Sequence, residues 1–266
     1  MGRLLGILGI LFALAPSSLV AQERSAQISI IIDDLGDQWR NGIRAVNLPG
    51  QITFAILPHT PYSIKLAHRA HAAGREVMLH FPMASSKPLR PGPGAVDVGM
   101  NQVSFRTQAR DNLAAIPFIR GVNNHMGSQV TPSMKHMGWL MDDLALRGDL
   151  FFVDSMTIGN SVAGMIAEEK GIPMVKRDVF LDNERDMASI RKQFRRLVRL
   201  AKRRGYAVAI GHPYPETLAL LESELPKLAA EGVELVPVSR LIQTHRQQEP
   251  VLWQASLFPS PVALKN

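Results

Sequence analysis

The sequence contains no cysteine among its 266 residues, which excludes disulfide bonds and thiol chemistry. It also lacks a glycine-rich phosphate-binding motif and the GxSxG motif of serine hydrolases. Ser155 follows Asp154 without that context, so a serine nucleophile is not expected. These absences favour chemistry that uses histidine, carboxylates and metal-activated water.

Residues 1–21 have the features of a signal peptide. Arg3 supplies a positive charge, the segment from Leu4 to Ala15 is almost entirely apolar, and small residues continue to Ala21. The apolar run is too short to span a bilayer, which needs about 20 residues. We therefore expect an exported protein, periplasmic or extracellular after signal removal, with the cleavage site left open. An uncleaved membrane tether is the alternative.

The formal net charge is +7, and the excess is concentrated between Arg191 and Arg204. Lysines and arginines alternate there with the apolar residues Phe194, Leu197 and Val198, which predicts an amphipathic helix with a basic face. A solvated helix face is one interpretation, and weak contact with anionic surfaces of the cell envelope is the other. Nucleic acid is not an expected partner, since the chain shows no recognition motif.

Residues 22–246 are predicted to form one α/β domain, and residues 247–266 a proline-containing C-terminal tail. Short apolar runs alternate with helix-like stretches, as in βα units. One helix is expected to begin at Thr131-Pro132 and to end at Gly148. The expected strands are Ile28–Ile32, Ile52–Leu57, Glu76–Leu79, Arg120–Asn123, Leu150–Val153, Pro173–Lys176, Val208–Ile210 and Val233–Val236.

Glycines stand just before several of these strands, where the end of a helix favours a left-handed residue. They are Gly74, Gly171, Gly205 and Gly232. The segment from Pro82 to Met100 is rich in proline and glycine and is expected to be a long irregular loop, which inside a compact domain is more often functional than accidental.

Polar residues follow most of the expected strands. Seven or eight βα units can close into a barrel or lie in an open doubly wound sheet, and in both the carboxyl ends of the strands carry the chemistry. A single histidine in such a position has a structural explanation, but four histidines together with aspartates indicate a site. The residues at strand ends are Asp33, Asp34, His59, His80, Asn124, His125, Asp154, Arg177, Asp178 and His212.

Asp33 and Asp34 are the most informative pair, because they end a buried strand of β-branched residues. Two adjacent carboxylates need a cation or another partner in such surroundings. One can hold a metal ion while its neighbour moves protons. A solvated turn is the alternative for this segment. Two histidines and one carboxylate are a familiar ligand set for hydrolytic zinc, and the same donors accept Mn, Fe, Co or Ni.

Five segments resemble the divergent polysaccharide deacetylase branch of the NodB-like carbohydrate esterase superfamily. The resemblance runs from Ile28 to Leu241, and it implies a distorted (β/α) barrel of about seven strands with its site at their C-terminal ends. The segments are Ile31 to Gly36, His80 to Met83, Asn123 to Ser128, Phe152 to Thr157 and Ile210 to Pro213.

The resemblance also implies roles for individual residues. Asp33 would be the general base, His212 the general acid, and Asp154 an aspartate that orients the histidine or the base. Asp34 and His80 would bind one divalent metal ion, most simply Zn. Family members with activity carry a second ligand histidine shortly after the first, which this sequence lacks, and His125 is the best substitute.

The implied activity is the removal of N- or O-linked acetyl groups from an envelope or extracellular glycan, such as a peptidoglycan-type polymer. The alternative is a catalytically inactive envelope protein that binds glycan or a protein partner through the same pocket. Further residues expected to line that pocket, with a surface position as the alternative for the last three, are His59, Asn124, Ser128, Arg177, Asp178 and Asp182.

Overall fold

The structure is a computed structural model that describes residues 25–246. The predicted signal peptide and C-terminal tail therefore lie outside the described residues, and both stay predictions. Within residues 25–246, no helix has the length and the apolar character needed to cross a membrane.

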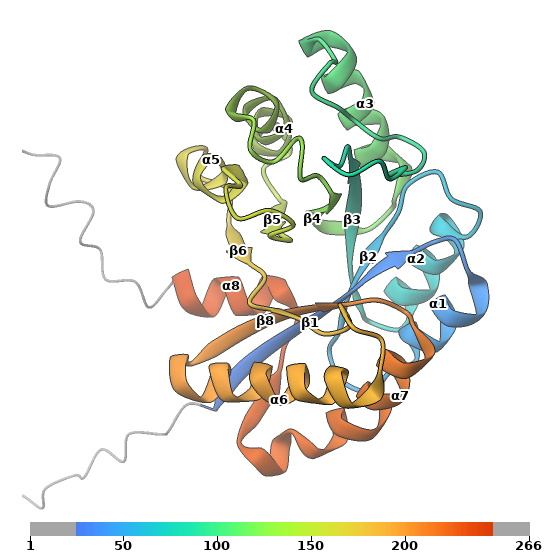
Figure 1. Ribbon diagram of the computed structural model, residues 1–266, viewed down its shortest axis with the longest axis vertical. Coiled ribbons are helices and arrows are strands. Elements are labelled where there is room, and N and C mark those ends of the chain that lie inside the picture. Colours follow the sequence, from blue (N-terminus) through green and yellow to red (C-terminus); the bar gives the residue numbers. More distant parts are fainter. Residues whose placement is uncertain (1–24, 247–266) are drawn as a thin grey trace, which may run out of the picture.

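The described chain forms one curled sheet in which every strand pairing is parallel (Figure 1). The strand order is β6-β5-β4-β3-β2-β1-β8-β7, and β9 pairs with the beginning of β1. The strands are β1 (Ala26–Leu35), β2 (Thr53–Ile56), β3 (Glu76–Met83), β4 (Ile119–Met126), β5 (Phe151–Asp154), β6 (Met174–Lys176), β7 (Val179–Phe180), β8 (Tyr206–Gly211) and β9 (Val233–Leu235).

Helices surround this sheet (Figure 1). Their apolar faces pack with the outward side chains of the strands into the larger of two cores, whereas the last helix packs into the smaller core inside the curl. They are α1 (Trp39–Val46), α2 (Ser63–Ala72), α3 (Gln102–Ala115), α4 (Met134–Arg147), α5 (Ala163–Glu169), α6 (Met187–Arg204), α7 (Pro215–Glu224) and α8 (Val238–Arg246), with short 3-10 turns at Leu225–Lys227 and Ala229–Glu231.

The sheet curls so far that one short segment touches both of its edges. β6 pairs with β5 at one end of the sheet, and β7 pairs with β8 at the other. Only Arg177 and Asp178 separate β6 from β7 along the chain. The predicted barrel-like α/β fold is confirmed. Each of the eight expected strands overlaps an observed one, and the two-residue β7 was missed because so short a strand has no sequence periodicity.

The side chains on the concave face of the sheet explain why the site lies inside the curl. Successive residues of a strand point to opposite faces, so residues two apart share a face. Ile31, Met78 and Ile210 belong to the small inner core. Two residues further along the chain come Asp33, His80 and His212. The same alternation that buries the apolar residues therefore aims these polar side chains into the mouth of the sheet.

The predicted start of α4 is wrong by two residues. Ser133, and not Thr131, caps the helix, and the Ser133 hydroxyl accepts a hydrogen bond from the backbone N–H of His136. Thr131 is fully buried in the preceding turn, where its N–H bonds the carbonyl of Gly127. Both residue types cap helices well, so local preference alone could not choose between them. The predicted end is confirmed, since Gly148 adopts a left-handed conformation with φ 73°.

Candidate metal centre

A local irregularity at the end of β1 brings two neighbouring carboxylates to the same place. In a regular strand Asp33 and Asp34 would point to opposite faces of the sheet. The pairing of β1 with β2 shifts register between Ile32 and Leu35, and Asp34 adopts a left-handed conformation with φ 57°. Aspartate tolerates this conformation better than most residues. The bulge therefore turns Asp34 toward the site that Asp33 already faces.

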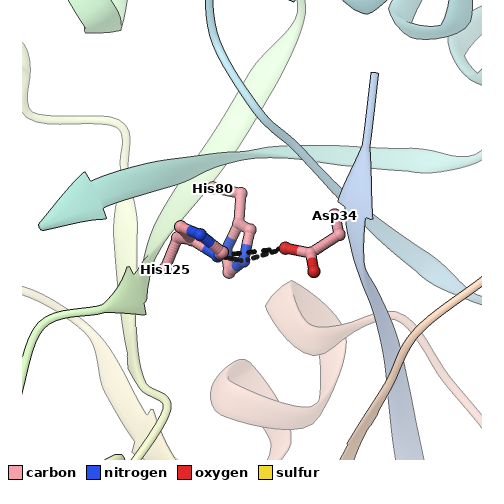
Figure 2. A group of neighbouring side chains, drawn as sticks. All are labelled: Asp34, His80 and His125. Atoms are coloured by element: carbon pink, nitrogen blue, oxygen red, sulfur yellow. Dashed lines mark hydrogen bonds and ion pairs between the residues drawn. The ribbon is translucent and has the colours of Figure 1, made fainter. Parts of the chain in front are cut away.

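Three donor atoms from three different strands converge on one point (Figure 2). Asp34 Oδ1 lies 3.1 Å from His80 Nε2 and 3.0 Å from His125 Nδ1. The two histidine nitrogens are 3.1 Å apart. Asp34 Oδ1 is buried and has no hydrogen-bond partner within the described residues. The three atoms form a nearly equilateral triangle, so one point can lie about 2 Å from each, which is the usual distance of a Zn²⁺ ion from nitrogen and oxygen ligands.

The hydrogen bonds behind the triangle fit a metal ion as well. His80 Nδ1 donates to the side-chain carbonyl of Asn123 at 2.8 Å, which leaves the lone pair of Nε2 directed at the site. The Asn123 amide nitrogen donates to Asp33 Oδ1, also at 2.8 Å. One fully buried amide therefore holds both a ligand histidine and the neighbouring carboxylate. Three converging acceptor atoms need a cation or a proton between them, so the residues present fit a divalent ion.

His212 stands on the other side of Asp34. Its Nε2 lies 3.7 Å from Asp34 Oδ2, and its Nδ1 donates to Asp182 Oδ1 at 2.9 Å. Asp182 Oδ2 accepts two further hydrogen bonds, from the backbone N–H of His212 and from the hydroxyl of Thr217. The buried Asp182 therefore fixes the ring of His212 and presents Nε2 to the site.

Charges in this cluster shift the pKa values in different directions. Burial raises the pKa of Asp33 above its ordinary value. Burial also opposes ionisation of Asp34, but the close contacts with the imidazole rings of His125 and His80 outweigh it and hold the pKa of Asp34 below its usual range. For His212 burial favours the neutral ring, whereas the hydrogen bond to Asp182 and the charge of Asp34 raise the pKa to about 9.

The pKa of His80 is raised in the same way, because the carboxylates of Asp33 and Asp34 outweigh the effect of burial. Without an ion the cluster thus favours a proton on His80. A metal ion and a proton compete for the same ring nitrogen, so metal affinity must fall as the pH decreases.

The cluster forms the floor of a cleft of about 600 Å³. The long proline- and glycine-rich loop after β3 contributes one wall of this cleft, through Ser85, Lys87 and Leu89. Residues Arg90 to Pro93 of the same loop line a smaller cleft that also reaches Asp34 and His125. The remaining wall residues of the larger cleft are Asn124, Met126, Ser128, Ser155, Met156, Thr157, Arg177, Phe180, Asp182, Asn183, Arg185, Ile210 and Tyr214.

The structure brings together most of the residues expected at the site. Asp33, Asp34, His80, His125 and His212 meet on the floor of the cleft, and Asn124, Ser128, Arg177 and Asp182 line it. Their roles in catalysis stay predictions.

Asp154 does not make the contact expected of it. Its carboxylate accepts hydrogen bonds from the backbone N–H of Met156 and from the hydroxyl of Ser161, and thus shapes the loop after β5. Asp182 is the carboxylate that holds His212. Sequence could not distinguish the two, because the choice depends on which strand end lies beside β8.

His59 and Asp178 also lie apart from the cleft. His59 Nε2 is hydrogen-bonded to Asn112 of α3, and Asp178 pairs with Arg204 at the end of α6. In contrast, Asn123 was not expected to be a site residue. Its signal in the sequence is its spacing, since it stands two residues before His125 on the same face of β4.

Comparisons with known proteins agree with this geometry. The sequence model of the family described as divergent polysaccharide deacetylase matches residues 30–242. An uncharacterized protein of Haemophilus influenzae is 34% identical over 244 residues, which cover 90% of this chain and 86% of the relative. The uncharacterized protein YibQ of Escherichia coli is 36% identical over 220 residues, which cover 82% of this chain and 68% of the relative.

Solved structures share the fold. An uncharacterized protein from Agrobacterium tumefaciens superposes with a TM-score of 0.79 at 25% identity, over 83% of this chain and 91% of that chain. A mutant of the peptidoglycan deacetylase PdaC from Bacillus subtilis gives a TM-score of 0.51 at 15% identity, over 88% and 98%. A CE4 family pseudoenzyme from Bacillus anthracis gives 0.52 at 13% identity, over 82% and 66%. The last two show the fold alone.

Proposed function

The chain belongs to the divergent polysaccharide deacetylase family, and from this premise we propose that it is a metal-dependent hydrolase that removes acetyl groups from a glycan of the cell envelope or extracellular space. The observation that carries the proposal is the donor triangle of Asp34, His80 and His125, with Asp33 and His212 beside it. A binding protein would not need a buried carboxylate and a positioned histidine next to the same three donors.

The three donors would hold one divalent ion, most simply Zn²⁺. When bound, such an ion polarises the acetyl carbonyl and lowers the pKa of water. Asp33 is suited to accept a proton from the attacking water, because burial raises its pKa above the ordinary value and Asn123 fixes one of its oxygens. No second histidine follows shortly after His80 in the sequence, and His125 would provide the third donor in its place.

His212 is suited to donate a proton to the departing amine or alkoxide. Its pKa of about 9 keeps the ring protonated at neutral pH. The hydrogen bond from Nδ1 to Asp182 leaves the proton on Nε2 facing the site. The acid and the base are thus held in opposite protonation states, as hydrolysis of an amide or ester requires.

The first test is metal content together with acetate release. The purified protein should contain about one divalent ion per chain, measured by elemental analysis, and should release acetate from at least one substrate among chitin oligomers, peptidoglycan fragments and O-acetylated glycans. Asp34→Ala, His80→Ala and His125→Ala should each lower the metal content strongly. Normal metal content in one of these variants would remove that residue from the ligand set.

A catalytically inactive envelope protein is the alternative function. The fold also occurs in a pseudoenzyme, so the fold alone does not decide. A metal-loaded protein that binds these glycans and releases no acetate from any of them would establish this alternative. We also propose export, which would bring the protein to such a polymer. Amino-terminal sequencing of the exported form that still reads through residues 4–15 would show an uncleaved tether instead.

A further inference from the structure

The wall of the cleft carries positive charge that the proposed reaction does not use. Lys87, Arg177 and Arg185 all line the cleft. Within residues 25–246 none of them forms an ion pair, in contrast to Arg106 and Arg204, which do. The acidic residues that line the same cleft are Asp33 and Asp34 on its floor and Asp182 on its wall. Within the described residues these carboxylates pair with histidines and not with the cations on the wall.

Arg177 is held in place, which distinguishes it from a mobile surface arginine. Its Nε donates to the carbonyl of Ser155 at 2.7 Å, and a terminal nitrogen donates to the carbonyl of Met156 at 2.9 Å. The guanidinium also packs over Phe180, with 5.0 Å between its carbon and the ring centre. An arginine fixed in this way loses little conformational entropy when it binds an anion.

Ser155 adds an independent observation. The residue is 5% exposed, and its hydroxyl is buried without a hydrogen-bond partner among the described residues. Its backbone N–H and carbonyl are both used, by Asn124 and Arg177. An unpaired buried hydroxyl in a cleft wall is costly unless a ligand completes it. Ser155 and Arg177 belong to the same part of the cleft lining, because Arg177 bonds the carbonyl of this serine.

We propose that Arg177 and Ser155 form a subsite for an anionic group, a carboxylate or a phosphate, on the acetylated sugar substrate. Arg185 and Lys87 add positive charge at the outer part of the same cleft. This inference rests on the proposed function and narrows its substrates to acidic glycans.

The position of the subsite relative to His212 indicates which sugar of the substrate carries the anionic group. The ring of Phe180 lies close to both Arg177 and His212, with 5.0 Å from its centre to the guanidinium carbon and 5.4 Å to the centre of the imidazole ring. The guanidinium and the proposed acid therefore border the same aromatic ring. The anionic group belongs on the sugar that carries the acetyl group or on the sugar next to it.

A titration followed by NMR tests the subsite with three sugars: N-acetylglucosamine, which is neutral, N-acetylmuramic acid, which carries a carboxylate, and N-acetylglucosamine 6-phosphate. At low ionic strength at least one anionic sugar should bind about tenfold more tightly than the neutral one. The two anionic sugars distinguish a carboxylate subsite from a phosphate subsite. Acetate release is read from the same spectra.

Arg177→Gln should reduce the preference to within about twofold and leave the affinity for the neutral sugar nearly unchanged. Arg195→Gln makes the same change of charge on the exposed face of α6, outside the cleft, and should keep the preference. Ser155→Ala removes the hydroxyl and leaves both backbone hydrogen bonds in place. It should lower the affinity for the anionic sugar a few-fold, and it decides the matter if Arg177→Gln does not fold.

Equal binding of the three sugars by the wild type, or no binding of any, would overturn the proposal. A preference for the anionic sugar that persists in Arg177→Gln would also overturn it. If Arg177→Gln does not fold, the same holds for a preference that persists in Ser155→Ala. A preference for an anionic sugar in a protein that releases no acetate from chitin oligomers, peptidoglycan fragments or O-acetylated glycans would support the subsite and contradict the proposed function.

Discussion

Asn123 offers the sharpest test of the arrangement, because one side chain holds two groups of the centre. Its amide joins His80 Nδ1 to Asp33 Oδ1 with two hydrogen bonds of 2.8 Å, and it is fully buried. Asn123→Ala removes both bonds and leaves two buried groups without partners, each at a cost of about 1–3 kcal/mol. The free energy of unfolding should fall by an amount of this order, measured by urea denaturation of the metal-free protein.

The same substitution should weaken the centre itself. His80 loses the acceptor that keeps its proton on Nδ1, and we expect metal affinity to fall about 10- to 100-fold, measured by competition with a chelator. Asp33 loses a hydrogen bond that favours its charged form, so its pKa, which burial already raises, moves further upward. The acidic limb of the activity profile should therefore shift to higher pH.

Asn112→Ala is the matched control. Asn112 is also fully buried, and its amide also joins a histidine, His59, to another group, the carbonyl of Gly94. It lies outside the centre, so the variant should lose comparable stability and keep its metal affinity within about twofold. The reasoning is refuted if Asn123→Ala binds metal as the wild type does and its acidic limb does not move.

Three further substitutions test separate parts of the structure. Asp33→Asn should keep the metal content while turnover falls about 10²-fold or more, and loss of the metal instead would make Asp33 a ligand. Asp182→Asn removes the negative charge that helps to raise the pKa of His212 to about 9, so the alkaline limb and the NMR titration of that ring should move to lower pH; an unchanged titration would contradict the assigned contact. Gly121→Ala would place a methyl group 2.3 Å from the ring of Phe151. Denaturation should show that the free energy of unfolding falls by about 1–3 kcal/mol. Unchanged stability would mean that the ring can move freely.

The sequence allowed the fold and much of the floor of the site to be predicted, because both depend on local patterns. Runs of β-branched residues marked the strands, and glycines marked the ends of helices, as at Gly205, where φ is 90°. Alternation along a strand then determined which polar residues share a face with the buried ones. Asp33, His80 and His212 each stand two residues after a member of the inner core, and this spacing can be read without a structure.

Contacts between strand ends could not be predicted in this way. Asp154 and Asp182 are both buried aspartates near the ends of strands, yet Asp182 reaches His212 and Asp154 bonds its own loop. His59 follows β2 as regularly as His125 ends β4, but it turns toward α3. Which of these side chains meet depends on strand order and on the path of each loop, and no local preference encodes either.

By itself the sequence determined a parallel α/β fold, a cluster of histidines and aspartates at the carboxyl ends of its strands, and the absence of any thiol. Tertiary structure decided how these residues become a centre. The bulge at Asp34 gives two neighbouring carboxylates the same direction, and the pairing of β3 with β4 brings His125 within 3.1 Å of His80. Sequence patterns describe residues that are a few positions apart along the chain. A ligand set requires atoms from distant chain segments to lie within a few ångströms of one another, and only the tertiary structure brings those segments together.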